Sequence, residues 1–205
     1  MYKYNCNECT TKCDGTSKKI YNFKSDVELS EYYEKELIAK ITNAGYYAVK
    51  TTKNQYPDIE IYDEHNGKMK CFIEVKVQRR SFMSVSKILP QSNLVPSETL
   101  ALNLSDLQHY ISQKKEHYIP VYILWVLLER PCIIKDKKVL AYYNDLDELE
   151  KILNKYGDKR RFRRKSGSGD VVNGEHKGVV VNYHFSISEL KPFSLTNILS
   201  EYCKI

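Results

Sequence analysis

The sequence contains no long apolar run. Its most hydrophobic stretch, residues 119–128, is interrupted by Pro120 and Tyr122 and is much shorter than the roughly 20 apolar residues of a membrane-spanning helix. The first residues, MYKYNC, have neither the apolar core nor the small-residue cleavage site of a signal peptide. We therefore expect a cytosolic (cytoplasmic) protein that has no membrane partner.

Several catalytic motifs are also missing. The chain has no glycine-rich phosphate-binding loop and no G-x-S-x-G turn, which argues against an ATPase and against a serine hydrolase. The five histidines form neither an H-x3-H nor an H-E-x-x-H pattern. Candidate catalytic residues must therefore come from outside these motifs.

The charge balance is modestly basic, with a formal net charge of +6, which is compatible with a polyanionic partner such as nucleic acid. Six of the seven residues 159–165 are cationic, and Ser and Gly alternate directly after them. This composition predicts a mobile basic loop over residues 157–170 that binds phosphate. The alternative is a solvated basic loop without a partner. The cations are Lys159, Arg160, Arg161, Arg163, Arg164 and Lys165.

The 205 residues and 42% hydrophobic content suit one main domain. We assign residues 25–205 to it and treat the Cys-rich residues 1–24 as an appendage. Helices are predicted from Ser25 or Asp26 to Gly45, over 105–117 and over 145–156, and strands over 46–51, 58–62, 70–77, 118–128, 133–143 and 179–187, with a long connection over 79–103. This order indicates an α/β fold with a mixed central β-sheet flanked by helices.

Three ionisable residues crowd the predicted hairpin around the Asn66-Gly67 turn. Residues two apart in a strand share a face, so Glu74 and Lys76 are neighbours. Asp58 opens the facing strand and brings a second carboxylate to the same end of the hairpin. Two adjacent carboxylates repel unless a cation lies between them, and a hard divalent cation suits oxygen ligands. The alternative is a solvent-exposed strand face.

Glu34 is a third acidic candidate. It precedes Leu37, Ile38 and Ile41 at helical spacing, so it lies on the apolar stripe that must pack against the sheet. The alternative is a carboxylate at the edge of the interface that extends into solvent.

The hairpin register sets a condition on this hypothesis. With a strict two-residue turn at Asn66-Gly67, Asp58 comes opposite Val75 and therefore on the wrong face. The hypothesis requires an extra loop residue, or a bulge near Pro57, to correct the parity.

Together, Glu34, Pro57-Asp58 and Glu74-Val75-Lys76 resemble the PD-(D/E)XK nuclease superfamily, with a spacing from Glu34 to Gly45 similar to that of the archaeal Holliday-junction-resolvase branch. The resemblance covers residues 26–78 well and extends loosely to residue 128. It implies a restriction-endonuclease-like core of order αβββαβ. It also implies that Asp58, Glu74 and the Val75 carbonyl bind Mg²⁺ or Mn²⁺, with Glu34 joining directly or through water, and that Lys76 orients or deprotonates the attacking water.

The resemblance implies a Mg²⁺-dependent nuclease that acts on DNA, and the small size of the chain, the absence of a motor domain and a C-terminal region that could serve recognition favour an endonuclease. Gln78, Arg79, Arg80 and the six cations of residues 159–165 are the predicted DNA contacts. A junction resolvase or repair nuclease is the enzymatic alternative, and a non-catalytic nucleic-acid-binding protein with a cysteine-bound metal is the alternative of another class. A homodimer is left open.

The cysteines suggest a second metal. Cys6, Cys9 and Cys13 form C-x2-C-x3-C, and Cys203 is a candidate fourth ligand from the other terminus. Three close thiols in a cytosolic chain resemble part of a zinc or iron-sulfur site. The alternative is free thiols on an unstructured tail. Cys71 alternates with Ile73 and Val75 and is predicted to lie in the core.

Overall fold

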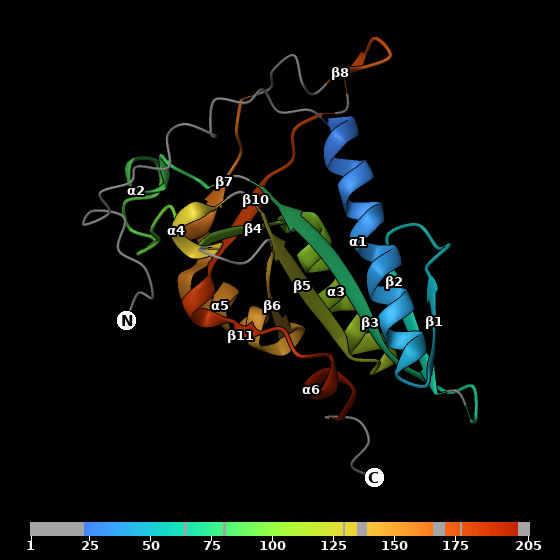
Figure 1. Cartoon of the computed structure of the whole chain (residues 1–205). Coiled ribbons are helices and arrows are strands. Elements are labelled where there is room, and N and C mark those ends of the chain that lie inside the picture. Colours follow the sequence, from blue (N-terminus) through green and yellow to red (C-terminus); the bar gives the residue numbers. More distant parts are fainter. Residues whose placement is uncertain are drawn as a thin grey trace.

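A mixed six-stranded β-sheet with helices on both faces forms the centre of the computed structural model (Figure 1). The structure describes residues 23–63, 65–79, 81–128, 130–134, 139–165, 171–176 and 178–200. The helices are α1 (Phe23–Asn43), α2 (Val85–Ile88), α3 (Leu104–His117), α4 (Pro131–Ile134), α5 (Leu146–Tyr156) and α6 (Leu195–Ser200), with 3-10 turns η1 (Gly157–Arg160) and η3 (Ile187–Glu189). The strands are β1 (Tyr46–Lys50), β2 (Ile59–Asp63), β3 (Met69–Gln78), β4 (Thr99–Asn103), β5 (Val121–Leu127), β6 (Leu140–Asp145), β7 (Arg161–Phe162), β8 (Val171–Val172), β9 (Glu175–His176), β10 (Asn182–Ser186) and β11 (Lys191–Pro192).

The strand order of the large sheet is β1-β2-β3-β5-β6-β11. Strands β3 and β5 are parallel, and the other neighbours are antiparallel. Along the chain α1, β1, β2, β3, α3 and β5 follow the expected αβββαβ order, with α2 and β4 inserted after β3. The predicted mixed α/β sheet is therefore confirmed. No helix in the described ranges has the length and apolarity needed to cross a bilayer.

Strand β5 separates two hydrophobic clusters. Tyr122 and Leu124 face the cluster that contains the α1 stripe, and Ile123 and Trp125 face the cluster that contains α3, α5 and β10. All seven residues of β5 are buried, as the continuous apolar sequence predicted. Figure 1 shows α1 and α3 on opposite sides of this strand.

Helix α1 ends where the sequence indicated. Gly45 has a φ of +85° and donates its N–H to the carbonyl of Thr42, and this left-handed conformation suits glycine best. At the other end the helix begins at Phe23, so the predicted cap residues Ser25 and Asp26 lie inside its first turn. A carboxylate in that turn still interacts favourably with the free N–H groups.

The structure corrects two expectations about strands. The predicted connection over residues 79–103 contains β4, which pairs with β10 in a second sheet of order β4-β10-β7. The predicted strand over 133–143 instead begins as α4 and becomes β6 only at Leu140, because Pro131 suits the first position of a helix. β4 lacks a local hairpin signal because its partner comes from much later in the chain.

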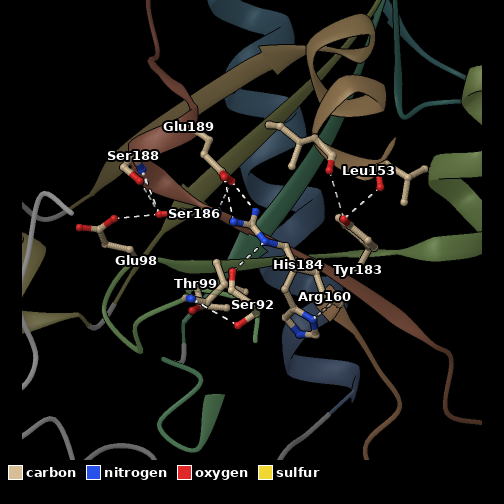
Figure 2. A network of polar contacts seen from close by, with 12 residues as sticks. Ser92, Glu98, Thr99, Leu153, Arg160, Tyr183, His184, Ser186, Ser188 and Glu189 are labelled. Carbon is tan, nitrogen blue, oxygen red and sulfur yellow. Dashed lines mark hydrogen bonds and ion pairs between the residues drawn. The ribbon is translucent and has the colours of Figure 1, made fainter. Parts of the chain in front are cut away.

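Arg160 anchors a polar network beside the second sheet (Figure 2). The residue is 1% exposed. Its guanidinium forms two hydrogen bonds to Glu189 at 2.7 and 2.9 Å and donates through Nε to the carbonyl of Ser92. The Tyr156 ring stacks 3.5 Å from its central carbon. This burial corrects the prediction that Arg160 belongs to a mobile loop and contacts DNA, because its charge is already neutralised inside the fold.

We expect Arg160→Ala to lower the free energy of unfolding by about 3 kcal/mol, because it leaves Glu189 without its cation in a largely buried position. Urea denaturation measures the change. Arg161→Ala is the matched control, since its ion pair with Asp158 is exposed and its removal should cost less than about 1 kcal/mol. Equal destabilisation of the two variants would contradict the structural role of Arg160.

Candidate active site

The register of β2 and β3 is irregular near the hairpin loop. Asp63 donates its N–H to the carbonyl of Lys68, which closes a loop wider than the two residues predicted. Tyr62 then pairs with Met69, but Ile61 pairs with Cys71, so Lys70 is an extra residue in β3. The wider loop leaves the parity unchanged, and the bulge at Lys70 corrects it.

The bulge brings Asp58 and Glu74 to the same face of the sheet. Ile59 pairs with Ile73, so the preceding residue, Asp58, comes level with Glu74. The irregularity that the hypothesis required is present, although it lies next to the turn and not near Pro57. On this face Glu74 and Lys76 point away from α1 and toward α3.

Asp58 is held by the backbone of β3. Its Oδ2 accepts a hydrogen bond of 2.8 Å from the Val75 N–H. Burial and then the negative charge of Glu74 raise the pKa of Asp58 to about 7, while the Val75 hydrogen bond and the Lys76 charge oppose the shift. Asp58 therefore changes charge near neutral pH.

Glu74 is 2% exposed, and both of its carboxylate oxygens have partners. Oε2 accepts a hydrogen bond of 2.9 Å from the Tyr110 hydroxyl, and Oε1 forms an ion pair with the Lys76 amine. Burial and the Glu74 charge raise the pKa of Tyr110, so its hydroxyl remains a donor. Tyr110 thereby fixes the orientation of the carboxylate.

Lys76 lies between two acidic side chains. Besides Glu74, its amine is 3.9 Å from Asp106 Oδ2. Burial lowers the pKa of Lys76, but the charge of Glu74 and their hydrogen bond outweigh that effect, so the net direction is upward. The amine is therefore a cation at neutral pH.

Glu34 is buried on α1, on the opposite side of the sheet from Tyr110. Its Oε2 lies 2.8 Å from the Lys50 amine. This ion pair gives the buried carboxylate of Glu34 a cation from β1. The contact with Glu34 raises the pKa of Lys50 despite the opposing effect of burial. Glu34 and Asp58 also interact electrostatically.

The structure thus groups Asp58, Glu74 and Lys76, and it pairs Glu34 with Lys50. Within the ranges that the structure describes, no three His, Cys, Asp or Glu side chains are close enough together to hold a metal ion. Any cation here must use two carboxylates together with backbone or water oxygens.

Sequence reasoning missed Lys50, Tyr110 and Asp106. Lys50 alternates with the buried Ala48, which indicated that it faces α1. Tyr110 follows Leu107 by three residues on the buried face of α3, so helical spacing pointed it toward the sheet. Nothing in the local sequence showed that this face meets Glu74.

The predicted DNA contacts next to the site lie in different surroundings. The Gln78 amide donates to the Ala101 carbonyl at 2.7 Å and accepts from the Ala101 N–H at 3.3 Å, so it joins β3 to β4. Arg79 contacts Ser25 and Asp26 of α1. Arg80 lies outside the described residues. DNA binding by Gln78, Arg79 and Arg80 stays a prediction.

The basic segment is more ordered than predicted at its start. Arg161 lies in β7 and pairs with Asp158, and Arg163 donates to the carbonyl of Val179. Lys159 and Lys165 are exposed. Residues 166–170 lie outside the described part of the chain. The exposed cations stay candidates for phosphate contacts.

The proposed cysteine site cannot be placed, because Cys6, Cys9, Cys13 and Cys203 lie outside the described residues. Cys71 is buried in the cluster that contains α1, as predicted. Burial raises the pKa of its thiol to about 12, so this thiol is protonated and unreactive.

The sequence matches no protein-family model and no curated protein. Among solved structures, the fold is similar to Hjc, a Holliday junction resolvase from the archaeal hyperthermophile Archaeoglobus fulgidus. The TM-score is 0.44 at 10% sequence identity, over 84% of this chain and 96% of that chain. A likeness of this size says nothing about the activity of this chain.

The raised pKa of Asp58 predicts a pH-dependent stability. An unfolded Asp has a pKa of about 3.9, so the folded state holds the proton more tightly between about pH 4 and pH 7. The free energy of unfolding should therefore fall as pH rises through this window. In EDTA, urea denaturation of Asp58→Asn should show a weaker pH dependence than the wild type.

Asp158→Asn is the control for this experiment, because Asp158 is exposed. It should keep the wild-type pH dependence. An Asp58→Asn variant whose stability still falls as steeply over the same window would show that Asp58 is not the group responsible.

Proposed function

We propose that the protein is a metal-dependent nuclease that hydrolyses phosphodiester bonds in DNA, as its resemblance to PD-(D/E)XK enzymes implies, and that it acts as an endonuclease. One observation carries this proposal. Asp58 and Glu74 lie level on one face of β2 and β3, with the Lys76 cation against Glu74. A structural ion pair would need only one carboxylate, whereas here burial, and then repulsion from Glu74, raise the pKa of a second carboxylate, that of Asp58.

The donor set fits a hard divalent cation such as Mg²⁺ or Mn²⁺. Asp58 and Glu74 supply carboxylate oxygens. The Val75 N–H points to Asp58, and since the N–H and C=O of a strand residue point to the same side, the Val75 carbonyl faces that side too. Glu34 would join through water. When bound, the cation neutralises charge on the phosphate and acidifies water.

Tyr110 and Lys76 have separate roles in the proposed reaction. Tyr110 keeps Glu74 in one orientation through its hydrogen bond. Lys76, with its raised pKa, is protonated at neutral pH, so we assign it to orienting the water and stabilising negative charge. Of the two roles that the resemblance implies for Lys76, this assignment favours orienting the attacking water over deprotonating it. Deprotonation of the water then falls to another base.

Lys76→Ala should lower the rate of Mg²⁺-dependent DNA cleavage by roughly 10²- to 10³-fold, the range typical of removing one preorganised group that stabilises negative charge in the transition state. DNA affinity should stay nearly unchanged, because the amine acts on the transition state more than on the ground state. Linear, supercoiled and branched DNA, incubated with and without Mg²⁺, are the substrates. The branched substrate separates a junction resolvase from a general endonuclease.

Lys151→Ala is the matched control. Lys151 is an exposed lysine on α5 that pairs with Glu148, so this variant should cleave like the wild type. Normal cleavage by Lys76→Ala would refute the role of Lys76. No cleavage of any DNA by the wild type would favour the non-catalytic nucleic-acid-binding alternative.

The exposed cations of the basic segment should bind phosphates without reading sequence. The binding constant for duplex DNA falls as salt is added, and its logarithm is linear in the logarithm of the salt concentration. Replacing Lys159, Arg161 and Lys165 by Ala should reduce the steepness of this line by about 0.9 for each phosphate that the variant no longer neutralises. Fluorescence anisotropy at several salt concentrations measures the slope. Lys151→Ala, an exposed lysine on α5, is the control. An unchanged slope in the triple variant would leave this segment as a solvated loop without a partner.

A further inference from the structure

A pocket of about 320 Å³ opens beside the C-terminal end of β3. Its walls come from β3, β4, β7, β10 and the first turn of α1. The volume corresponds to roughly ten water molecules and lies in the range of small-molecule sites. The proposed roles of Asp58, Glu74 and Lys76 do not involve this pocket.

Three aromatic rings line the pocket. The Phe82 ring centre is 5.4 Å from that of Phe162 and 5.0 Å from that of His184, at interplanar angles of 30° and 41°. Phe82 and Phe162 are only partly buried and pack on a small cluster around Val85. Rings that are partly open to a pocket offer a surface on which a planar group can stack.

The polar groups of the pocket include acceptors and cations. His184 Nδ1 lies 3.1 Å from the Arg160 carbonyl (Figure 2), and since a carbonyl only accepts, Nδ1 carries the proton. Burial lowers the pKa of His184 to about 4, so the ring is neutral and Nε2 is an acceptor. Asp26 and Arg79, which pair with each other, also line the pocket together with Arg164, so the charged side chains of the lining carry a net positive charge.

The pocket is next to the candidate active site. Gln78, which lines it, follows Lys76 by two residues on the same face of β3, a separation of about 7 Å along a strand. A DNA strand with a phosphate at the candidate active site would therefore bring its adjacent nucleotide to this pocket.

We propose that this pocket binds one unpaired nucleobase of the DNA, turned out of the helix beside the phosphate that the site engages. The proposal rests on the proposed function, because DNA is its ligand. The base stacks on the Phe82 and Phe162 rings, its N–H groups meet the Nε2 acceptor of His184, and the net positive charge of the lining, to which Arg164 contributes, attracts a flanking phosphate. Planar shape, mixed polarity and positive charge together fit a nucleotide better than a purely apolar ligand.

The test compares three labelled duplexes by fluorescence anisotropy in EDTA, where no cleavage occurs. One duplex is fully paired, one carries a single mismatch, and one lacks the base at that position. A mismatched base costs least to turn out. Since stacking of a base on an aromatic side chain changes Kd by roughly 5- to 150-fold, the mismatched duplex should bind at least about fivefold tighter than the abasic one.

Phe82→Leu keeps an apolar side chain but removes the ring, so it should bring the mismatched and abasic duplexes to equal affinity. Phe162→Leu should have the same effect and serves if the first variant does not fold. Tyr118→Leu removes an exposed ring outside the pocket and should preserve the difference.

If the wild type bound the mismatched and abasic duplexes with equal affinity, the proposal that the pocket binds a base would be overturned, and the nuclease proposal would stay intact. A preserved difference in both phenylalanine variants would overturn it as well. Discrimination between the duplexes without any cleavage in Mg²⁺ would instead overturn the nuclease proposal alone. A wild type that binds no DNA would overturn both.

Discussion

The bulge at Lys70 decides which face of the sheet carries Asp58, because side chains of a strand alternate with a period of two. Without the extra residue, Asp58 would come level with Ile73 and point toward α1. With it, Asp58 and Glu74 share the face that α3 covers. The local geometry of one hairpin therefore determines whether two carboxylates meet or lie on opposite faces of the sheet.

Burying two neighbouring carboxylates is electrostatically unfavourable, and the surrounding groups offset this only in part. Lys76 and Tyr110 satisfy Glu74, and the Val75 N–H satisfies one oxygen of Asp58. Asp58 nevertheless keeps a pKa of about 7, so the compensation is incomplete. Glu34 and Lys50 form a separate ion pair on the α1 side. A fold that needed only stability would more simply place apolar side chains here.

The second sheet connects the candidate site to the rest of the molecule. Strand β4 receives hydrogen bonds at Ala101 from the side chains of Gln78 and Trp125, so its backbone is held against the large sheet. Arg160 and Glu189 hold the segment before β7. Strands β4 and β7 also form walls of the pocket, so these contacts position the pocket next to the end of β3.

The amino-acid sequence by itself determined helices α1, α3 and α5, strands β1, β2, β3 and β5, and the spacing of Glu74 and Lys76 on β3, because periodicity and turn residues are local signals. Its resemblance to one nuclease superfamily also indicated which acidic residues to compare. Only the tertiary structure decided the bulge at Lys70, the pairing of β4 with β10, the contact of Tyr110 with Glu74 and the burial of Arg160. Each of these depends on residues that are distant in the chain, and the packing and desolvation that select such contacts leave no local pattern.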